Sequence, residues 1–488
     1  MFQINRRSFM FGLGAFSLSP VFGVDIAPKS TFSGDIKGRR LKIASIACGG
    51  MGGSATSSLI SAGCDLVAVC DVNPGAFDHW EKQYPGIPKF TDYRDMLKTM
   101  GDKFEAVQIG TPDHTHAYIA VDCMLAGKHV YVQKPLARTV EECELMLKTQ
   151  LKTGRVAQMG NQGHPGVWRY KALRDAAVWG DVKEFYSWSD RPIWPQGMKE
   201  FAKAEKLPAN YAPNAWDCWC GPSADHGYAR AYHPFSWRGW WDYGCGAIGD
   251  MAVHNADPAF WAFELGLPVS VKADTYGEGP VTIAYPKKSR IEMTFAPSKW
   301  IPHPVKLTWF DGRVLPPVDA VPGFAAFAAE EGKRAEAARA ERAKKENKPY
   351  VAPEKIAPIF ADNGLVVIGS KMTTIGGSHA GRPICISGDK AAFDAAIAPG
   401  DKASNYNHYR EFVEACLAND PARCGSRLAY AAPLTEALLI GCIALRFPGE
   451  ELKFDAKSMK FTNKPEANAF LKAPSRGDWD FGKMMAGR

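Results

Sequence analysis

Between residues 41 and 160 the hydrophobic residues form short unbroken runs, and longer amphipathic stretches lie between these runs. Short unbroken apolar runs are typical of parallel strands that are covered on both faces. They predict strands at 41–47, 65–70, 106–110, 129–132 and 156–159, and the stretches between them predict helices that end near Ala62 or cover 116–126 and 140–153. Strands that alternate with helices at this spacing predict a doubly wound parallel α/β sheet.

A different pattern follows residue 160, where the segments are longer and rich in aromatic residues and proline. Residues 291–296 and 305–310 alternate apolar and polar positions, as strands of a half-buried antiparallel sheet do. Further strands are predicted at 182–190, 269–276 and 365–368, and helices at 406–418 and 429–447. This half of the chain therefore predicts a second domain of a different kind.

The second half also contains a charged insertion. Residues 325–348 are almost entirely Ala, Glu, Lys and Arg, which indicates an exposed helix or a mobile insertion. A surface decoration is the favoured interpretation, and a lid over the site is the alternative.

The chain begins with a motif that is typical of export. Asn5-Arg6-Arg7-Ser8-Phe9-Met10 leads into a short apolar segment, 9–24, which glycine and proline interrupt. That segment is too short and too broken for a membrane span, so it predicts a twin-arginine signal peptide and no membrane anchor. We expect a periplasmic or secreted protein that is exported already folded.

Composition narrows the class of protein. A chain of 488 residues is too long for one ordinary core, so two domains are expected. Its 46% hydrophobic and 23% charged residues are typical of a soluble globular protein. The net charge of +7 is not gathered into a dense basic patch, which argues against nucleic acid as a partner. Cys218-Trp219-Cys220 lacks the paired spacing of a zinc site, so no metal is predicted.

A glycine turn follows the first predicted strand. Ala47-Cys48-Gly49-Gly50-Met51-Gly52 is an A-x-G-x-x-G form of the dinucleotide fingerprint, in which Ala47, Gly49, Gly50, Met51 and Gly52 would approach the pyrophosphate. Asp71 ends the second strand, where an acid binds the adenosine ribose and repels a 2′-phosphate. The motif predicts NAD rather than NADP. A Rossmann-like domain without a nucleotide is the alternative.

Two later motifs carry groups suited to proton transfer. Lys134 directly follows the strand 129–132, at the edge of the sheet where ligands bind. Asp250, His254 and Asp257 are spaced i, i+4 and i+7, which predicts one helix face with a neutral histidine flanked by carboxylates. Such a histidine can accept a hydroxyl proton as hydride leaves the same carbon. Taken singly, a solvated lysine and a helix cap with a satisfied histidine are the ordinary interpretations.

In combination, these motifs resemble the Gfo/Idh/MocA family (glucose–fructose oxidoreductase, inositol dehydrogenase and relatives). The resemblance runs from about Leu41 to Phe447 and rests on the glycine turn, Thr111-Pro112 with His116, Gln133-Lys134-Pro135, and Gly246-Ala247-Ile248-Gly249-Asp250 with His254. It implies an N-terminal Rossmann domain, a C-terminal α/β domain with an open, mostly antiparallel sheet, and NAD(P)-dependent redox chemistry on a sugar or cyclitol carbon.

The resemblance also implies roles for single residues. His254 would be the general base, Asp250 a substrate-binding or relay partner, and Lys134 the cation that positions the reacting oxygen. The common Glu-Lys-Pro is Gln133-Lys134-Pro135 here, and loss of that carboxylate should let Lys134 lose its proton more easily. Further candidates for binding the cofactor are Thr111, Pro112, His114, His116, Gln133, Lys134 and Asn161. The candidates for binding the substrate are Gln162, His164, Arg169, Tyr232, His233, Arg238 and Trp241.

We therefore expect a signal peptide at 1–30, an NAD-binding Rossmann domain at 40–160, and a substrate and oligomerisation domain at 161–450. That second domain contains the charged insertion 319–358, and an extension at 451–488 follows it. A homodimer or homotetramer is expected, because members of the family often pack through the sheet of the second domain.

The sequence is consistent with three functions. The first is an NAD-dependent oxidoreductase that acts on a hydroxyl-bearing carbon of a sugar or glycoside. The second is a glycoside hydrolase with tightly bound, recycled NAD, which oxidises C3, eliminates the leaving group, adds water and reduces the ketone. The third is a non-catalytic periplasmic sugar-binding protein. The aromatic residues between Trp168 and Trp261 suit sugar rings, and they suit a large aromatic core equally well.

Overall fold

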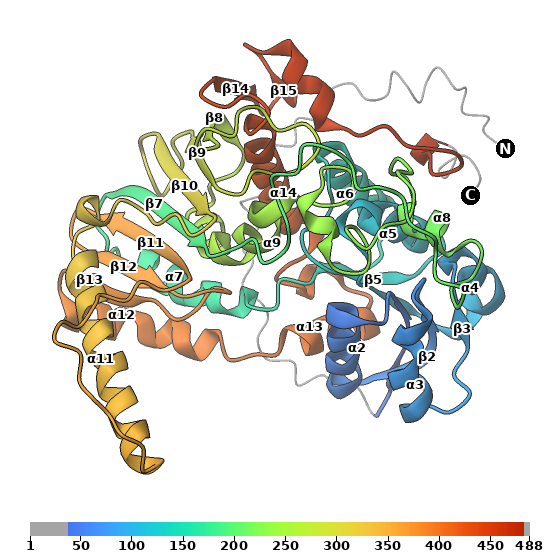
Figure 1. Ribbon diagram of the computed structural model, residues 1–488, viewed down its shortest axis with the longest axis horizontal. Coiled ribbons are helices and arrows are strands. Elements are labelled where there is room, and N and C mark those ends of the chain that lie inside the picture. Colours follow the sequence, from blue (N-terminus) through green and yellow to red (C-terminus); the bar gives the residue numbers. More distant parts are fainter. Residues whose placement is uncertain (1–37, 483–488) are drawn as a thin grey trace.

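A computed structural model describes residues 38–482, which form two domains side by side (Figure 1). The predicted signal peptide and the last residues of the C-terminal extension lie outside the described residues. Within 38–482, no helix is long and apolar enough to cross a membrane.

The first domain is built on a six-stranded parallel sheet with the order β3-β2-β1-β4-β5-β6. The sequence runs outward from β1 in both directions, so the crevice of this doubly wound sheet opens between β1 and β4. The strands are β1 (Leu41–Ile46), β2 (Cys64–Cys70), β3 (Lys89–Phe90), β4 (Ala106–Ile109), β5 (His129–Val132) and β6 (Ala157–Met159), and the helices are α2 (Gly50–Ala62), α3 (Asp78–Gln83), α4 (Tyr93–Met100), α5 (His116–Leu125) and α6 (Val140–Thr153).

The second domain is built on a nine-stranded sheet with the order β13-β12-β11-β7-β10-β9-β8-β14-β15. Only β7 and β10 pair in parallel, and the other neighbours are antiparallel. The expected fold class is thus confirmed. The strands are β7 (Val182–Ser189), β8 (Pro268–Asp274), β9 (Ser289–Phe295), β10 (Val305–Asp311), β11 (Asn363–Gly369), β12 (Thr373–Gly376), β13 (Ile384–Ser387), β14 (Glu451–Asp455) and β15 (Lys460–Phe461).

Two helices of the second domain pack on its sheet, and one of them also packs on the first domain. Helix α9 packs on β7, β10 and β11, while α14 packs on β8 and β9 and also touches α6 and β6 of the first domain. The α14 sequence is apolar on every side, as a helix enclosed by both domains requires. The helices are α7 (Val167–Asp175), α8 (Ala215–Cys220), α9 (Gly246–Asn255), α10 (Asp257–Phe263), α12 (Lys390–Ala403), α13 (His408–Ala418) and α14 (Leu428–Ala444).

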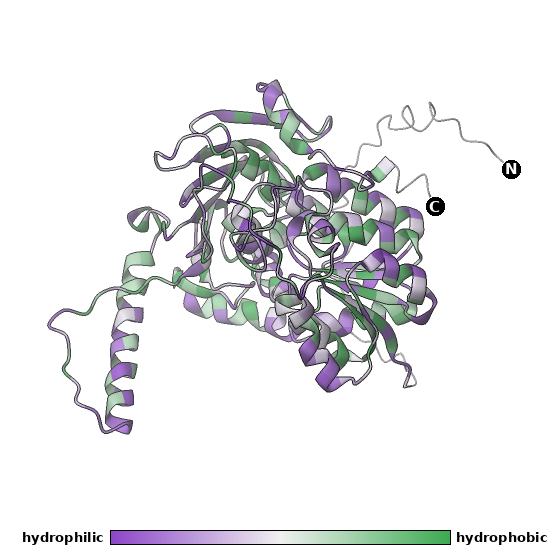
Figure 2. Ribbon diagram, turned by 45° about the vertical axis from the view of Figure 1, so that its right-hand side comes forward, coloured by the Kyte–Doolittle hydropathy of each residue, from purple (hydrophilic) through white to green (hydrophobic). Residues whose placement is uncertain are grey.

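The charged insertion is mostly a helix, α11 (Phe324–Lys345), which projects from the body of the protein (Figures 1 and 2). Its first residue, Phe324, is buried beside Trp188 on the sheet, and the helix beyond Gly332 is largely exposed and charged. No residue of α11 lines the cleft described below.

Candidate active site

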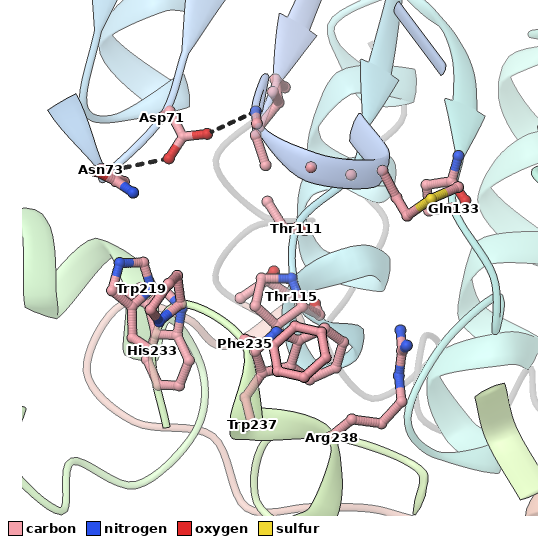
Figure 3. A pocket seen from close by; sticks show the side chains of 18 of the residues that line it. Asp71, Asn73, Thr111, Thr115, Gln133, Trp219, His233, Phe235, Trp237 and Arg238 are labelled. Carbon is pink, nitrogen blue, oxygen red and sulfur yellow. Dashed lines mark hydrogen bonds between the residues drawn. The ribbon is translucent and has the colours of Figure 1, made fainter. Parts of the chain in front are cut away.

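A cleft of about 920 Å³ lies between the domains, at the carboxyl edge of the parallel sheet (Figure 3). Loops that follow β1, β2, β4 and β5 form one wall, and residues of the second domain from the segment 191–254 form the opposite wall. Ligands of doubly wound sheets bind at this edge, so the fold places a candidate ligand site where both domains meet.

The glycine turn after β1 forms the floor of the cleft. Ala47 and Gly50 have φ values of 60° and 48°, so the backbone turns sharply before α2 begins. A Cβ atom on Gly52 would lie 1.9 Å from the Ala47 carbonyl oxygen, and one on Gly110 would lie 2.6 Å from the Gly52 Cα. These two glycines therefore let α2 begin in direct contact with the ends of β1 and β4.

Helix α2 points its free N-terminus into this turn. Within residues 38–482 no side chain caps it, and its first turn contains no acidic residue. Its unpaired backbone N–H groups and the positive end of its dipole favour an anion there. Gly49, Gly50 and Met51 line the cleft at this point, whereas Gly52 is buried beneath them.

Asp71 follows β2 and lies at one end of the cleft (Figure 3). Its two carboxylate oxygens accept hydrogen bonds from the backbone N–H groups of Gly49 (3.2 Å) and Asn73 (2.9 Å). Desolvation raises the pKa of Asp71 to about 6, and these hydrogen bonds oppose the rise. The glycine cradle, the uncapped helix and this carboxylate together fit a dinucleotide, with the ribose at Asp71 and the pyrophosphate on α2.

Lys134 and Asp250 meet at the opposite end of the cleft, one from each domain. The Lys134 Nζ donates to Asp250 Oδ1 at 2.7 Å and to the Asp250 main-chain oxygen at 2.9 Å. Burial lowers the pKa of Lys134, and the charge of Asp250 opposes that shift. Burial also disfavours the Asp250 carboxylate, but Lys134 and Arg238 outweigh this effect and hold its pKa at about 2. The Asp250 carboxylate is therefore ionised at neutral pH, and its charge favours the ammonium form of Lys134.

Two arginines complete the charge network around Asp250. Arg238 donates from Nη1 to Asp250 Oδ1 at 2.6 Å and from Nη2 to Asp113 Oδ1 at 3.1 Å. Arg191 places its Nε 3.5 Å from Asp250 Oδ2. Asp113 is fully buried and also accepts from the Cys245 backbone N–H. Arg238 thus links a loop of the first domain to the acid on α9.

His254 lies one turn beyond Asp250 on α9 and is buried. Neither of its ring nitrogens has a hydrogen-bond partner among residues 38–482. Burial, followed by the charge of Lys134, lowers the pKa of His254 well below its ordinary value, so the ring is neutral. The imidazole stacks on His379 with ring centroids 4.0 Å apart. A neutral base with free nitrogens thus lies beside the lysine.

The prediction that Asp250, His254 and Asp257 share one helix face is wrong for Asp257. Helix α9 ends at Asn255, and α10 begins at Asp257 with Pro258 in its first turn. The two helices are thus separate elements, and Asp257 accepts hydrogen bonds from Asn161 (3.0 Å) and Tyr430 and contacts His164 (2.9 Å). His254 is therefore not flanked by two carboxylates.

The other cofactor candidates divide into two groups. Thr111, Pro112 and Gln133 line the cleft, and the Thr111 hydroxyl and Gln133 amide nitrogen have no partner among the described residues. His114 and His116 lie behind it and contact backbone carbonyls. The His116 ring nitrogens lie 2.8 Å from the carbonyl oxygens of Thr111 and Pro135, so this side chain holds the two loops together.

The substrate candidates divide in the same way. Gln162, His233 and Arg238 line the cleft. Four others lie outside its lining: His164 contacts Asp257, Arg169 pairs with Asp401, Tyr232 is packed in an aromatic cluster, and Trp241 stacks on Tyr285. Asn161 is also absent from the lining, because its amide nitrogen donates a hydrogen bond to Asp257 of the second domain.

The sequence patterns missed several residues that line the cleft. His379 comes from the loop between β12 and β13, Arg191 follows β7, and Trp219 lies on α8. Trp237 lies beneath Arg238, whose guanidinium carbon is 4.3 Å from a Trp237 ring centroid. Trp479 reaches the cleft from the C-terminal extension. Trp237 belongs to the polar and aromatic stretch that ends at Arg238, whereas the other four belong to no recognisable motif, so only the fold brings those four to the site.

A glycine cradle joined to a lysine, an aspartate and a neutral histidine is typical of a nucleotide-dependent oxidoreductase. Known protein families show which class of oxidoreductase the two domains resemble. Residues 41–161 match the oxidoreductase family, NAD-binding Rossmann fold, and residues 186–301 match the oxidoreductase family, C-terminal alpha/beta domain. Residues 41–161 and 186–301 thus carry the two domains of this oxidoreductase family, and the first is an NAD-binding Rossmann domain.

Individual relatives are more distant. The chain is 33% identical over 125 residues to a 1-carboxy-3-chloro-3,4-dihydroxycyclohexa-1,5-diene dehydrogenase of Comamonas testosteroni, covering 25% of this chain and 31% of the relative. It is 30% identical over 183 residues to a glycosyl hydrolase family 109 protein of Shewanella baltica, covering 33% and 39%. These matches span well under half of either relative.

A solved structure shares the fold over most of the chain. The WlbA dehydrogenase from Bordetella pertussis, in complex with NADH and UDP-GlcNAcA, aligns with a TM-score of 0.53 at 16% identity and covers 86% of this chain and 99% of its own. At this identity the likeness shows the fold alone.

Proposed function

We propose that the protein transfers a hydride between NAD and a hydroxyl-bearing carbon of a sugar or glycoside. The observation that carries this proposal is the convergence, in one cleft, of the glycine cradle with the Lys134–Asp250 pair and His254. When bound, NAD supplies the hydride acceptor. The residues of the chain then have to position the substrate oxygen and take its proton.

Lys134 and His254 divide these two tasks. Lys134 is held by Asp250 with its ammonium in the cleft, where it donates a hydrogen bond to the reacting oxygen. His254 is neutral with both nitrogens free, so it accepts the hydroxyl proton as the hydride leaves the carbon. Asp250 keeps Lys134 charged and oriented. In the reverse direction the same histidine returns the proton to the oxygen.

The position of Asp71 supports NAD over NADP. A ribose with free 2′ and 3′ hydroxyls can donate to its carboxylate, whereas a 2′-phosphate would bring negative charge against it. The cleft-facing aromatic side chains support a sugar or glycoside, because Trp237 and the 56% exposed Phe235 offer apolar faces beside the polar Arg238 (Figure 3). The WlbA relative, which is bound to a nucleotide sugar, is in keeping with this substrate class.

A second candidate is redox-assisted glycoside cleavage with the same NAD recycled. In this reaction C3 is oxidised, a proton leaves the acidified C2, and the leaving group departs by elimination. Water then adds, and the stored hydride reduces the ketone, so the net reaction is hydrolysis. The similarity to the Shewanella protein and the second imidazole at the site, His379 stacked on His254, favour this candidate.

Location and assembly belong to the same proposal. The motif at Asn5-Arg6-Arg7 supports export by the twin-arginine route, which carries folded proteins and so allows NAD to be bound before export. A homodimer or homotetramer is proposed from the family resemblance. Fusion of residues 1–40 to a reporter tests export, and light scattering of the purified protein tests the oligomeric state.

The function is tested with purified protein that receives no added nucleotide. We would incubate it with alkyl and aryl glycosides and follow released sugar and nicotinamide absorbance together. Many turnovers of cleavage without net NADH establish the recycling hydrolase, while a single burst of NADH, or reaction only after NAD is added, establishes the oxidoreductase. Binding of sugar with no turnover under either condition would instead support a non-catalytic sugar-binding protein.

The same assay tests the assigned residues. Lys134→Met and His254→Asn should each lower turnover roughly 10²- to 10⁴-fold, because each removes a group that acts on the substrate proton or oxygen. Lys152→Met is the matched control, since Lys152 is exposed on α6 and does not line the cleft. Undiminished turnover in the double variant would overturn the assignment.

A further inference from the structure

The C-terminal extension returns to the nucleotide cleft. After the short helical segment Pro465–Leu471, the chain leaves the second domain and crosses toward α8 and the first domain (Figure 1). We name residues 472–482 the C-terminal strap. Trp479 of this strap is only 6% exposed and lines the same cleft as Asp71.

Arg476 fastens the strap to the second domain. Its guanidinium donates to the Asp217 carboxylate at 2.7 Å, to the Asp217 carbonyl at 2.8 Å and to the Ser223 carbonyl at 2.8 Å. The Arg476 backbone N–H also donates to the Pro222 carbonyl at 3.1 Å. One side chain thus holds the end of α8, whose Cys218 and Trp219 line the cleft.

Trp479 and Phe481 fasten the strap to the first domain. The Arg94 guanidinium lies 4.7 Å from the Trp479 ring centroid, and the Tyr93 ring centroid lies 6.1 Å from it. Phe481 stacks on Tyr118 of α5 with centroids 3.8 Å apart. The strap therefore joins α8 of one domain to α4 and α5 of the other, across one end of the cleft.

This end of the cleft belongs to the adenosine half of the site. Asp71 follows β2, and Thr91, Asp92 and Tyr93 follow its neighbour β3, so all of them lie on the ribose side. Lys134 and Gln133 follow β5, on the opposite side of β1. A nucleotide that spans from α2 to Lys134 would place its adenosine between the β2 and β3 loops and the wall formed by Trp219 and Trp479.

We propose that the C-terminal strap retains NAD, with Trp479 closing the adenosine end and Arg476 holding the strap shut. Release of the adenosine half then requires the strap to detach from α8 or from α4. The strap sets how long NAD stays bound, and hydride transfer takes place at the other end. This inference rests on the NAD site of the family and not on the proposed substrate or reaction, so either can fail without the other.

The test measures dissociation of NADH from the purified full-length protein by stopped-flow fluorescence after mixing with excess NAD. Trp479→Ala and Arg476→Gln should each raise the dissociation rate at least tenfold, and their combination should not multiply the effects, because both open the same strap. Phe470→Ala is the matched control. Phe470 lies in the same C-terminal extension, but it packs on Phe447 and does not line the cleft. Rates within twofold of the unaltered protein in both strap variants would overturn the proposal.

A second measurement needs no variant and covers the case in which a substitution impairs folding. Hydrogen exchange of the backbone amides in 475–482 is followed by mass spectrometry with and without saturating NADH. Slower exchange in the presence of NADH supports a strap that closes on the nucleotide, and identical exchange in both states would refute it.

Discussion

Asp71 is both the group that selects the nucleotide and a group with an altered proton affinity. Desolvation raises its pKa to about 6, while the carboxylate is the form that accepts hydrogen bonds from ribose hydroxyls. Binding therefore requires the deprotonated form, and affinity must fall as the pH falls through about 6. Each pH unit below that value should weaken NADH binding by about tenfold.

Fluorescence titration with NADH between pH 4.5 and 8 checks this prediction. Asp71→Asn should bind more weakly at pH 7.5 and lose the pH dependence, because no proton is released. Asp78→Asn, on the exposed helix α3, is the control and should keep the slope. A flat profile for the unaltered protein would show that Asp71 does not titrate in this range.

Single residues also show where sequence reasoning stops. Lys134, Asp250 and His254 stand in motifs, and the structure brings all three to one cleft. Asp257 failed because its i+7 spacing presumed an unbroken helix, although Asp257-Pro258 is a helix-start signal in its own right. Arg169 and His164 failed to reach the cleft because charged and polar residues near a domain junction are just as suited to buried pairs with Asp401 and Asp257.

At the scale of elements, the turn from β1 into α2 depends on the absence of a side chain at Gly52. In Gly52→Ala the added Cβ would lie 1.9 Å from the Ala47 carbonyl oxygen, so α2 has to move away from β1 and β4. We expect a loss of roughly 1–3 kcal/mol in the free energy of unfolding. NADH affinity should fall more than stability alone implies, because the helix N-terminus leaves its position.

Urea unfolding and NADH titration of the same variant separate these two effects. Gly101→Ala is a suitable control, because no atom lies within 4 Å of the position its Cβ would take and its φ is in the ordinary range. Normal NADH binding by Gly52→Ala would contradict the role given to this turn.

Elements with strong patterns were predicted well, and short ones were not. The unbroken runs of the parallel sheet and the alternation in β9 and β10 identified strands to within a few residues. The short strands β12 to β15 escaped, because strands of two to five residues carry too little periodicity to separate them from loops. The helix α12 also escaped, and it contains Pro399, which argues against a helix in the sequence. The composition of the charged insertion fits either an exposed helix or a mobile segment, and the structure shows a helix, α11.

On the scale of the whole molecule, charge holds the two domains in register. Asp113 of the first domain has no exposure and meets Arg238 of the second, which in turn meets Asp250. Removing one member of a buried pair costs up to about 3–5 kcal/mol, and Arg238 would here keep its contact with Asp250. Asp113→Ala should therefore lower the free energy of unfolding, by no more than that amount, and weaken the hold on Asp250.

Urea unfolding measures the loss, and Asp102→Ala provides the comparison. Asp102 pairs with Lys103 in solvent, so that variant should leave the free energy of unfolding nearly unchanged. Equal effects of the two substitutions would show that the Asp113–Arg238 contact does not join the domains.

The placement of the cleft between two folded units makes NAD a structural component as well as a reactant. A ligand that binds only the folded state adds RT ln(1 + [L]/Kd), or about 2.7 kcal/mol when its concentration is one hundred times Kd. Since Gly49 and Trp219 on opposite walls belong to different domains, that energy is shared by both. The melting temperature is then a gauge of occupancy, and a preparation that melts in two steps contains filled and empty molecules side by side.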